Sequence, residues 1–373
     1  MKYKFLLIML VLFTQLFLLS RADAHPATGI VIDRAGNVYF SDLETVWKID
    51  AQGKLSVFRQ GVNGRHVHEL TIDSQDNIYG GDISYEGQKW VSDVWKMTPA
   101  GTSTFLLAPT THPPRSMSNW LDRDGNMYLI DQNNHTKTKT LLLRRSPDGQ
   151  VITLAGGAYG HQDGKGAAAK FSNVGGMAFG PDGSLYLSDG DAVRKVTMEG
   201  SVTTVARELT TRTADDKPAL FGGSYGSLAG LSVDSSGSVY VADAGNRRLL
   251  RINRDGKTEV VFRTDPPYFP NGVAASPDGA IYVLEVGFTL PSAWSGPRVR
   301  KISADGTNRI IATVGTQGEG SVKAAVARNA GVATESVLSF FVIGDRIKYG
   351  VAILSVTLLS TIAILWRRRK QRA

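Results

Sequence analysis

Cysteine is absent from all 373 residues of the chain. The protein therefore has no disulfide bond, no zinc site built on thiolates, no thiol nucleophile and no dithiol redox chemistry. A folded domain that uses most of this length buries enough apolar surface to be stable without cross-links, even outside the cytoplasm. For an exported protein, the lack of disulfides favours a bacterial envelope over an animal cell surface.

Excess charge is also scarce once the two ends of the chain are set aside. The formal net charge is +8, of which residues 1–24 contribute +2 and residues 367–373 contribute +5. Only +1 remains for the residues between them. Because binding to a polyanion requires a strongly basic surface, we expect no nucleic-acid partner.

The first 24 residues have the composition of a secretory signal peptide. Lys2 and Lys4 precede an apolar run over residues 5–19, and the sequence ADA at residues 22–24 provides small residues for cleavage. The apolar run is short for a membrane span, so we predict a signal peptide over residues 1–24 rather than an uncleaved anchor.

A second membrane signal lies near the other end. Residues 349–366 contain no charged side chain, and as a helix they are long enough to cross the hydrocarbon core of a bilayer. Five basic residues follow within residues 367–373. The positive-inside rule predicts a single transmembrane helix over 349–366, a cytoplasmic tail over 367–373, and the preceding residues in the periplasm or at the cell surface. Residues 316–348 are predicted to be a linker.

Between these ends, one seven-residue phrase occurs six times with small changes. Its copies are GNVYFSD (36–42), DNIYGGD (76–82), GNMYLID (125–131), GSLYLSD (183–189), GSVYVAD (237–243) and GAIYVLE (279–285). Internal repeats at this period indicate stacked supersecondary units, and short apolar strands between Gly and Asp turns indicate antiparallel sheets. We therefore predict an all-β fold, a six-bladed β-propeller over residues 27–315 with four strands in each blade.

The turns also assign individual strands. In the first blade the predicted strands cover residues 29–33, 38–41, 46–50 and 55–58, and in the last blade residues 272–275, 281–284, 299–303 and 309–314. Because both terminal blades have all four strands, we predict no strand exchange where the ring closes.

Length varies in the connections between strands two and three and in those between blades. The turns between strands one and two and between strands three and four stay tight, whereas the other connections lengthen over residues 83–94, 132–141, 156–174, 208–228 and 286–298. These longer connections emerge on one face of a propeller, which we call the long-loop face. Loops on a rigid scaffold are where binding residues concentrate, so we predict that the function resides on this face.

Several residues of this face are candidates for ligand contact: Tyr85, Trp90, Tyr159, His161, Tyr225, Glu285 and Trp294. Exposed aromatic residues around a central opening suit the binding of a protein, a peptide or a glycan. The alternative is that they pack over one another with no ligand.

An acid closes each copy of the phrase: Asp42, Asp82, Asp131, Asp189, Asp243 and Glu285. Because a catalytic residue would be expected in one blade only, the repetition favours a structural role. We predict that these acids accept hydrogen bonds from backbone N–H groups at the following turn.

Parts of the chain resemble known propellers. Residues 156–206 and the stretch SVYVADAGNRRLLRIN (238–253) resemble NHL-repeat proteins, and PNGVAASPDGAIYVLE (270–285) resembles the gluconolactonase and regucalcin-like propellers. The resemblance covers about residues 27–315 and implies the propeller fold. It implies two different functions, because NHL members are mostly interaction platforms and gluconolactonase-like members are often metal-dependent lactone hydrolases.

The lactonase alternative requires Ca²⁺ or another divalent cation at the mouth of the channel, where it polarises a carbonyl group and activates water. The resemblance implies Asn271 as a metal ligand, and His68, Glu69 and Asn119 are further candidates. The family also uses an aspartate where this chain has only glycine or alanine, at residues 175–176 or 229–230. The candidate ligand set is therefore short of charge.

Alternation along a strand places His66 and His68 on the same side, where the pair can bind a metal or simply be hydrogen-bonded near the channel. No other cofactor is indicated. We predict a membrane-anchored interaction module that acts through its long-loop face, with a metal-dependent lactonase or esterase as the alternative.

Overall fold

The computed structural model of the protein describes residues 29–87, 89–110, 120–122, 124–132, 137–216, 228–289 and 293–315. The predicted signal peptide, linker, membrane span and tail lie outside these residues, as do the candidates Asn119 and Tyr225. For Tyr85, Trp90 and Trp294 the description includes the backbone and not the side chain.

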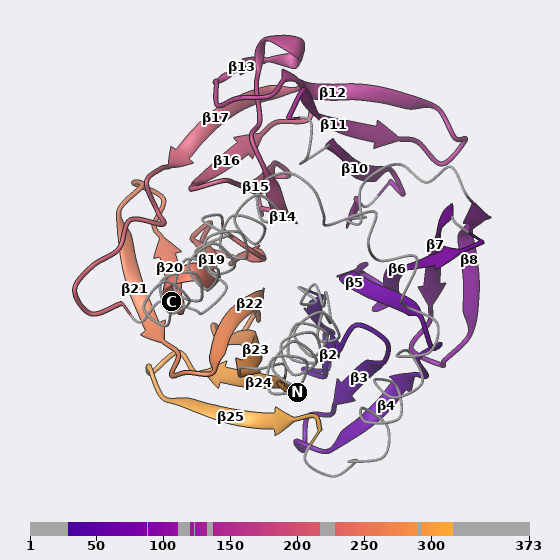
Figure 1. Ribbon diagram of the computed structural model, residues 1–373, viewed down its shortest axis with the longest axis vertical. Coiled ribbons are helices and arrows are strands. Elements are labelled where there is room, and N and C mark those ends of the chain that lie inside the picture. The colour runs from indigo at the N-terminus through magenta and orange to yellow at the C-terminus, as the bar shows by residue number, and fades with distance from the viewer. Residues whose placement is uncertain are drawn as a thin grey trace, which may run out of the picture. The chain divides into compact units, whose positions relative to one another are not determined.

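Six antiparallel sheets surround a central axis, each built from consecutive strands (Figure 1). Blade 1 contains β1 (Ile30–Ile32), β2 (Val38–Ser41), β3 (Val46–Ile49) and β4 (Leu55–Arg59). Blade 2 contains β5 (Arg65–Ile72), β6 (Ile78–Glu86), β7 (Lys89–Met97) and β8 (Ser103–Thr110). Blade 3 contains β9 (Trp120–Leu121), β10 (Met127–Gln132), β11 (Lys139–Arg145) and β12 (Val151–Ala158).

Blade 4 contains β14 (Val174–Phe179), β15 (Leu185–Asp189), β16 (Ala192–Val196) and β17 (Ser201–Ala206), with β13 (Gly164–Lys165) as a fifth strand at its outer edge. Blade 5 contains β18 (Leu231–Val233), β19 (Val239–Asp243), β20 (Arg248–Ile252) and β21 (Thr258–Arg263). Blade 6 contains β22 (Tyr268–Ala275), β23 (Ile281–Thr289), β24 (Ala293–Ile302) and β25 (Asn308–Thr313). The predicted six-bladed propeller is confirmed, and both terminal blades keep all four of their own strands.

Helical structure within the described residues is limited to two short 3-10 turns, η1 (Gly166–Ala168) and η2 (Ala244–Asn246). In this part of the chain no helix has the length and apolar character needed to span a membrane. The segment predicted to do so, residues 349–366, lies outside it.

The core consists of six apolar clusters, one at each interface between neighbouring blades. Successive side chains of a strand point to opposite faces, so alternate residues of each second strand pack against different neighbours. Tyr39, for example, packs toward blade 2, whereas Phe40 packs toward blade 6. This explains why the centre of the repeated phrase has consecutive apolar residues instead of apolar residues alternating with polar ones.

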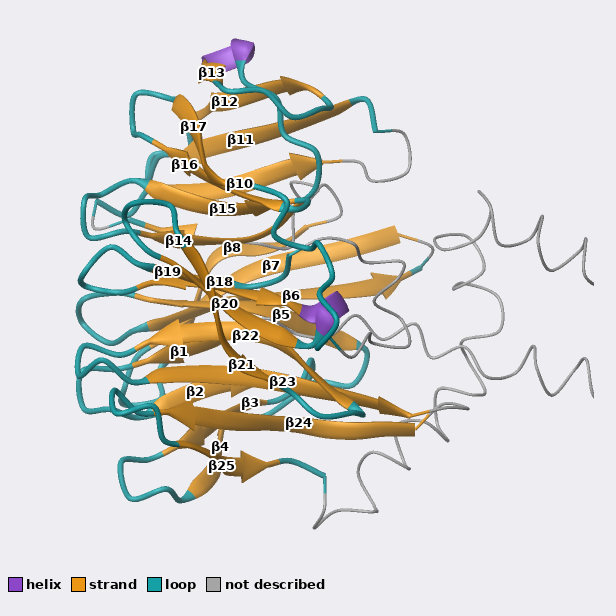
Figure 2. Ribbon diagram, turned by 90° about the vertical axis from the view of Figure 1, so that its left-hand side faces the viewer, coloured by secondary structure: helices purple, strands orange, loops and turns teal. Residues whose placement is uncertain are grey.

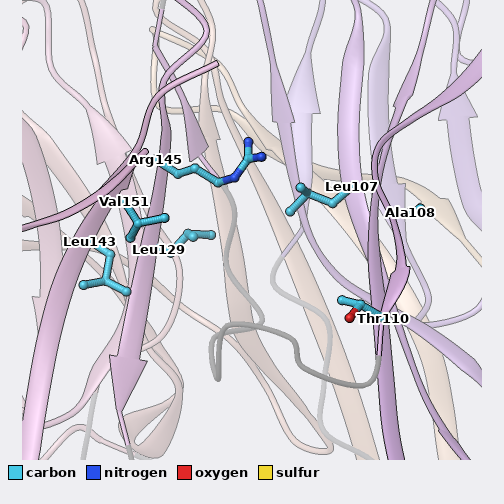
Figure 3. A pocket seen from close by; sticks show the side chains of 7 residues that line it. All are labelled: Leu107, Ala108, Thr110, Leu129, Leu143, Arg145 and Val151. Carbon is cyan, nitrogen blue, oxygen red and sulfur yellow. The ribbon is translucent and has the colours of Figure 1, made fainter. Parts of the chain in front are cut away.

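The interface between blades 2 and 3 has the smallest buried cluster, which contains Val94, Met127 and Leu129. A cavity of about 390 Å³ lies beside it (Figure 3). Its lining is mostly apolar and comes from the outer strands of both blades: Leu107, Ala108, Thr110, Leu129, Leu143, Arg145 and Val151. The cavity is in the side wall of the propeller and not on its axis.

The tyrosine of the repeated phrase is fixed at the face opposite the long loops. In blade 2, the Tyr79 hydroxyl donates to Asp73 at 2.8 Å, and the same carboxylate accepts from the backbone N–H of Asn77 at 2.9 Å. Lys96, directly opposite Tyr79 on the neighbouring strand, places its ammonium group 5.5 Å from the centre of the ring. A cation occupies this opposite position in all six blades: Lys48, Lys96, Arg144, Lys195, Arg251 and Lys301.

Blades 2 and 6 differ from the prediction. Residues 83–94 and 286–298, expected to be long loops, are mostly continuations of β6, β7, β23 and β24. They form two tall hairpins that extend on one side of the molecule beyond the other strands (Figure 2). Sequence length identified the unusual connections, but length alone does not distinguish a loop from an extended hairpin.

Candidate functional site

On the long-loop face the innermost strands begin around the axis of the propeller, at a level that we call the mouth of the channel (Figure 1). Hydrogen bonds join neighbouring blades there: Gly29 N–H donates to the His68 carbonyl at 2.9 Å, and Gly230 N–H donates to the Asn271 carbonyl at 2.8 Å. Strand β1 contacts both β5 and β22, so His68 and Asn271 lie on the two blades that flank blade 1. These contacts position the mouth residues through the backbone.

Three of the innermost strands have a β-bulge at this level. The pairing register shifts between Val67 and Leu70 in blade 2, between Val174 and Gly176 in blade 4, and between Pro270 and Gly272 in blade 6. The residues within these shifts are His68 and Glu69, Gly175, and Asn271 respectively. A bulge takes a residue out of the regular ladder and redirects its side chain, and bulges are frequent beside functional sites.

The side chains at the mouth are enclosed. His68 and Asn271 are buried, with 7% and 4% of their surface exposed, and Glu69 is half-buried. The rings of His66 and His68 lie edge to face with their centres 6.1 Å apart, as expected for residues on one side of a strand. An imidazole, a carboxylate and an amide are therefore brought to the mouth by two blades.

Blades 4 and 5 offer little chemistry at the mouth. A Cβ atom on Gly175 would lie 2.5 Å from the Leu228 carbonyl oxygen, and one on Gly176 would lie 3.0 Å from the Gly230 Cα. These glycines allow the backbones of blades 4 and 5 to approach closely. The aspartate that the resemblance leads one to expect here is missing because no side chain fits.

A divalent cation does not fit the described part of this site. No three His, Asp or Glu side chains converge on one point anywhere in the described ranges. Hard cations such as Ca²⁺ bind six to eight oxygen ligands, whereas the mouth provides one imidazole, one carboxylate and one amide. His68, Glu69 and Asn271 therefore do not form a cation site by themselves.

The recurring acids lie beneath the long-loop face, where each binds a cation or the N–H groups of a connection. In blade 4, Asp189 accepts the N–H groups of Ser172 and Asn173 at 2.7 and 3.0 Å and pairs with Arg194 at 2.9 Å. Both Asp189 and Arg194 are fully buried. Arg194 also reaches Asp163, so one ion pair fastens the incoming connection to the blade.

Blade 5 repeats this arrangement with other residues. The Arg248 guanidinium bridges Asp243 at 2.8 Å and Asp216 at 2.7 Å and donates to the carbonyl groups of Leu209 and Thr211. In blade 6, Glu285 is fully buried between Arg298 and Arg300, at 2.7 Å from the latter, and accepts from the Thr264 hydroxyl at 2.8 Å.

The sequence predicted that these acids accept hydrogen bonds from backbone N–H groups at the following turn, and such bonds are only part of what the structure shows. Asp42 does accept the N–H groups of Glu44 and Thr45 in the following turn, at 3.1 and 2.7 Å. In the remaining blades the main partner is an arginine or lysine side chain, which the repeat pattern does not reveal because its position in the chain varies.

Blade 2 breaks the pattern. Its acid, Asp82, is held by both terminal nitrogens of Arg59, which comes from blade 1, at 3.0 and 2.5 Å. On the third strand, where blades 5 and 6 have Arg248 and Arg298, blade 2 has a second acid, Asp93. Burial, and then the neighbouring Asp82 carboxylate, raise the pKa of Asp93 above its usual range, although Arg65 lies 3.5 Å away.

A buried indole accompanies this change. Trp47 in blade 1 donates from Nε1 to Asp42 at 2.7 Å. Trp95 occupies the corresponding position in blade 2, but its Nε1 is buried and has no hydrogen-bond partner among the described residues. Arg59 instead stacks on the Trp95 ring, with 4.4 Å from its Cζ to the ring centre. Aligning the third strands of the repeats would have identified Asp93 and Trp95 from the sequence.

The remaining candidates lie at separate places on the long-loop face. His161 is 3.6 Å from Asp189, and Tyr159 lies under the Lys137 ammonium group, which is 5.7 Å from the ring centre. Both belong to the connection between blades 3 and 4. Tyr85 and Trp90 are opposite each other on β6 and β7, and Trp294 is on β24. His68 and Glu69 lie within the bulge of blade 2 and Asn271 lies within the bulge of blade 6, on the two blades that flank blade 1.

Comparison with known proteins gives matches among solved structures only. No protein-family model matches the chain, and a search of curated proteins gave no match. Among solved structures, the chain is similar to virginiamycin B lyase from Staphylococcus aureus, with 13% identity and a TM-score of 0.46, covering 78% of this chain and 86% of that one. It is also similar to a gluconolactonase from Xanthomonas campestris, with 14% identity and a TM-score of 0.46, covering 69% and 83%.

A calcium-binding protein, regucalcin, from Agrobacterium tumefaciens is similar at 15% identity with a TM-score of 0.45, covering 70% of this chain and 83% of that one. A gluconolactonase and a regucalcin are thus among the solved structures to which the chain is similar, in line with the resemblance noted in residues 270–285. At such identities the likeness does not extend to the chemistry of the site.

Proposed function

We propose that the protein is an enzyme that hydrolyses an ester or a lactone at the mouth of its central channel. One observation supports this proposal above the others. The described mouth positions of blades 1, 4 and 5 are all glycine or alanine, whereas the bulges of blades 2 and 6 provide His68, Glu69 and Asn271. Polar side chains gathered on one side of a rigid ring are what a reaction site requires and what a purely structural repeat does not.

The residues fit acid–base chemistry without a metal. His68 takes a proton from water as its oxygen adds to the carbonyl carbon, and Asn271 donates an N–H group to the oxygen that becomes negative. The C–O bond then breaks, and the imidazolium returns its proton to the leaving alkoxide. Glu69 holds the imidazole in orientation, in the role that a carboxylate has beside a catalytic histidine.

A second candidate function is the recognition of a protein, peptide or glycan by the same face. The ion pairs of Arg194 and Arg248 support it, because they hold the long connections in one conformation. A preorganised surface loses less conformational entropy on binding than a mobile one. In both cases we propose that residues 1–24 are removed on export and that residues 349–366 anchor the propeller outside the cytoplasm.

Hydrolysis of a panel of lactones and p-nitrophenyl esters by the full-length protein tests the proposal. We expect turnover to fall about 100-fold or more in His68→Ala, the range for loss of a general base, and about 100-fold in Asn271→Ala, the range for loss of an oxyanion donor. Ser235→Ala, in an exposed turn on the opposite face, is the matched control and keeps full activity.

Treatment with EDTA separates metal-free from metal-dependent hydrolysis. Activity that survives EDTA supports the metal-free chemistry, and activity abolished by EDTA and restored by Ca²⁺ supports a cation held by His68, Glu69 and Asn271 together with residues outside the description. If the folded full-length protein turns over no ester or lactone in the panel, the proposed hydrolysis is wrong. Recognition by the long-loop face then becomes the function to test.

A further inference from the structure

Blade 3 departs from the other five blades at one position of its third strand. Arg145 lies opposite Met127, the first residue of the second strand. In the other blades the residue at this register position is apolar and buried: Ile49, Met97, Val196, Ile252 and Ile302. Each of the five belongs to the apolar cluster between its own blade and the preceding one. An arginine thus stands where the repeat otherwise has a core residue.

The cavity of about 390 Å³ lies at the corresponding interface, between blade 3 and the preceding blade 2. Arg145 is half-buried and is the one charged residue among the seven described residues that line the cavity. Figure 3 shows its guanidinium group extending from β11 toward Leu107 on β8. The volume falls within the range of small-molecule sites, roughly 300–1,000 Å³. The departure from the repeat and the cavity therefore belong to one feature.

Arg145 differs from the buried arginines of blades 4 and 5 in its partners. Arg194 and Arg248 each pair with two carboxylates, whereas no carboxylate within the described ranges forms an ion pair with Arg145. Asp148, three residues along, accepts from the Ser146 hydroxyl and from the Gln150 N–H. These bonds are the main reason that the pKa of Asp148 is lowered, and the charge of Arg145 is the smallest cause. A cation that faces an apolar cavity is stabilised by an anion inside it.

The other lining residues indicate what that anion carries. Leu107, Leu129, Leu143 and Val151 provide apolar surface, and Thr110 provides one hydroxyl group. A single guanidinium group neutralises one negative charge, and its planar shape suits a carboxylate. A phosphate dianion in the same place would keep a second charge without a partner beside apolar side chains.

We propose that the cavity between blades 2 and 3 binds an amphipathic carboxylate, with its charged group on Arg145 and its hydrocarbon chain against Leu107, Leu129 and Leu143. The site lies in the side wall of the propeller and not at the mouth of the channel, so the inference does not rest on the proposed hydrolysis.

Isothermal titration calorimetry of the full-length protein in a neutral detergent tests the site, with octanoate as the probe. Octanol and octylamine are the comparison probes, because they share the hydrocarbon chain and lack the negative charge. We expect octanoate to bind more tightly than either. From butanoate to octanoate, affinity is expected to rise about three- to fourfold for each methylene group that enters the cavity.

Arg145→Ile removes the cation and introduces the residue type that blades 1, 5 and 6 have at this position. Its affinity for octanoate is expected to fall at least about 10-fold, the range for loss of a hydrogen bond to a charged group. The matched control is Lys139→Ile on the same strand, which removes a cation from an exposed pair with Asp131. This control keeps the affinity of the unchanged protein, and so does His68→Ala at the mouth.

Four results would overturn the proposal. Equal octanoate affinity in Arg145→Ile and the unchanged protein means that the arginine does not hold the carboxylate. Equal affinity for octanoate and octylamine means that binding is apolar only. Loss of octanoate binding in His68→Ala places the ligand at the mouth. Absence of octanoate binding removes the site, while ester hydrolysis still reports on the mouth. If Arg145→Ile does not fold, the probe comparisons on the unchanged protein still decide.

Discussion

Blades 2 and 5 use the same structural position for opposite charges. In blade 5, Arg248 on the third strand faces Asp243 on the second, and both are buried. In blade 2 the third strand has Asp93 and the second has Asp82, and both are also buried. Blade 5 is therefore neutralised within its own sheet, whereas blade 2 requires Arg59 from the neighbouring blade and keeps a second acid, Asp93, which pairs with Arg65 at 3.5 Å.

The comparison shows what a repeat constrains. The acid at the end of the phrase must be neutralised because burial of an isolated charge is costly. The cation has several possible origins, because the blade, the preceding connection and the preceding blade all reach the same carboxylate. Selection on the repeat therefore fixes the acid and leaves the partner variable.

The largest predicted effect comes from removing the arginine of blade 5. Arg248→Ala leaves Asp243 and Asp216 buried without their shared cation, and loss of one partner of a buried pair costs about 3–5 kcal/mol of unfolding free energy. Chemical denaturation followed by tryptophan fluorescence measures it. Arg251 lies on the same strand as Arg248 and forms a partly exposed ion pair with Glu259 on β21. Its loss in Arg251→Ala is expected to cost about 0–1 kcal/mol. Equal losses in the two variants would contradict the assignment of Arg248 as the central cation.

An intermediate effect is expected on the opposite face, where blade 2 follows the common pattern. Tyr79→Phe removes the hydrogen bond from the tyrosine hydroxyl to Asp73 and is expected to cost about 1–2 kcal/mol. Tyr282→Phe is the matched control, because Ser276 stands where blade 2 has that aspartate. The denaturation midpoints of the two variants measure the stability that each one loses. A loss in Tyr282→Phe as large as that in Tyr79→Phe would show that the hydroxyl of blade 6 has an equivalent partner.

The smallest effect concerns pH and has opposite signs in two blades. Because the pKa of Asp93 is raised in the folded protein, its contribution to stability is present below the usual pKa of aspartate and is lost as the pH rises through the raised value. Asparagine does not ionise, so Asp93→Asn has no carboxyl group that must become charged in a buried position as the pH rises. The variant should therefore gain stability relative to the unchanged protein as the pH increases from 4 to 8.

Asp163, which pairs with Arg194 in blade 4, provides the contrast. Burial alone would raise its pKa, but hydrogen bonds from Thr204 and the charge of Arg194 bring it below the usual range. Its contribution is present above the usual pKa and is lost as the pH falls, so Asp163→Asn should lose most stability at neutral pH and least in acid. Denaturation of Asp93→Asn from pH 4 to 8, and of Asp163→Asn from neutral pH down to about pH 2, checks the two signs. A parallel response would contradict the contrast between the blades.

Much of the fold could be predicted from the residues. The first blade was predicted almost to the residue, since β2 covers the predicted residues 38–41, and the strands around it end at the Gly and Asp turns. The prediction for blades 2 and 6 was incomplete because a long connection can be a loop or an extended hairpin. The strand β13 was missed, since a two-residue strand has no pattern of its own.

The candidate site divides in the same way. Position in the repeat placed His68, Glu69 and Asn271 at one level of two inner strands, β5 and β22, but the bulges that redirect them depend on pairing across the sheet. Gly175 and Gly176 are missing a side chain for a reason that only packing reveals, namely the nearness of the blade 5 backbone. Arg59 is 23 residues in sequence from Asp82, which it contacts, so local patterns do not identify it, whereas an alignment of the third strands identifies Asp93.

By itself the sequence determined the number of blades, the order of the strands and the face that carries the long connections. These follow from a period repeated six times, because each copy can bury its apolar strand only between two neighbours. Only the tertiary structure decided which charge neutralises which acid and which side chains meet at the mouth of the channel. Those contacts join residues from different strands, connections and blades, and their energies depend on burial and distance, which no single segment of the chain contains.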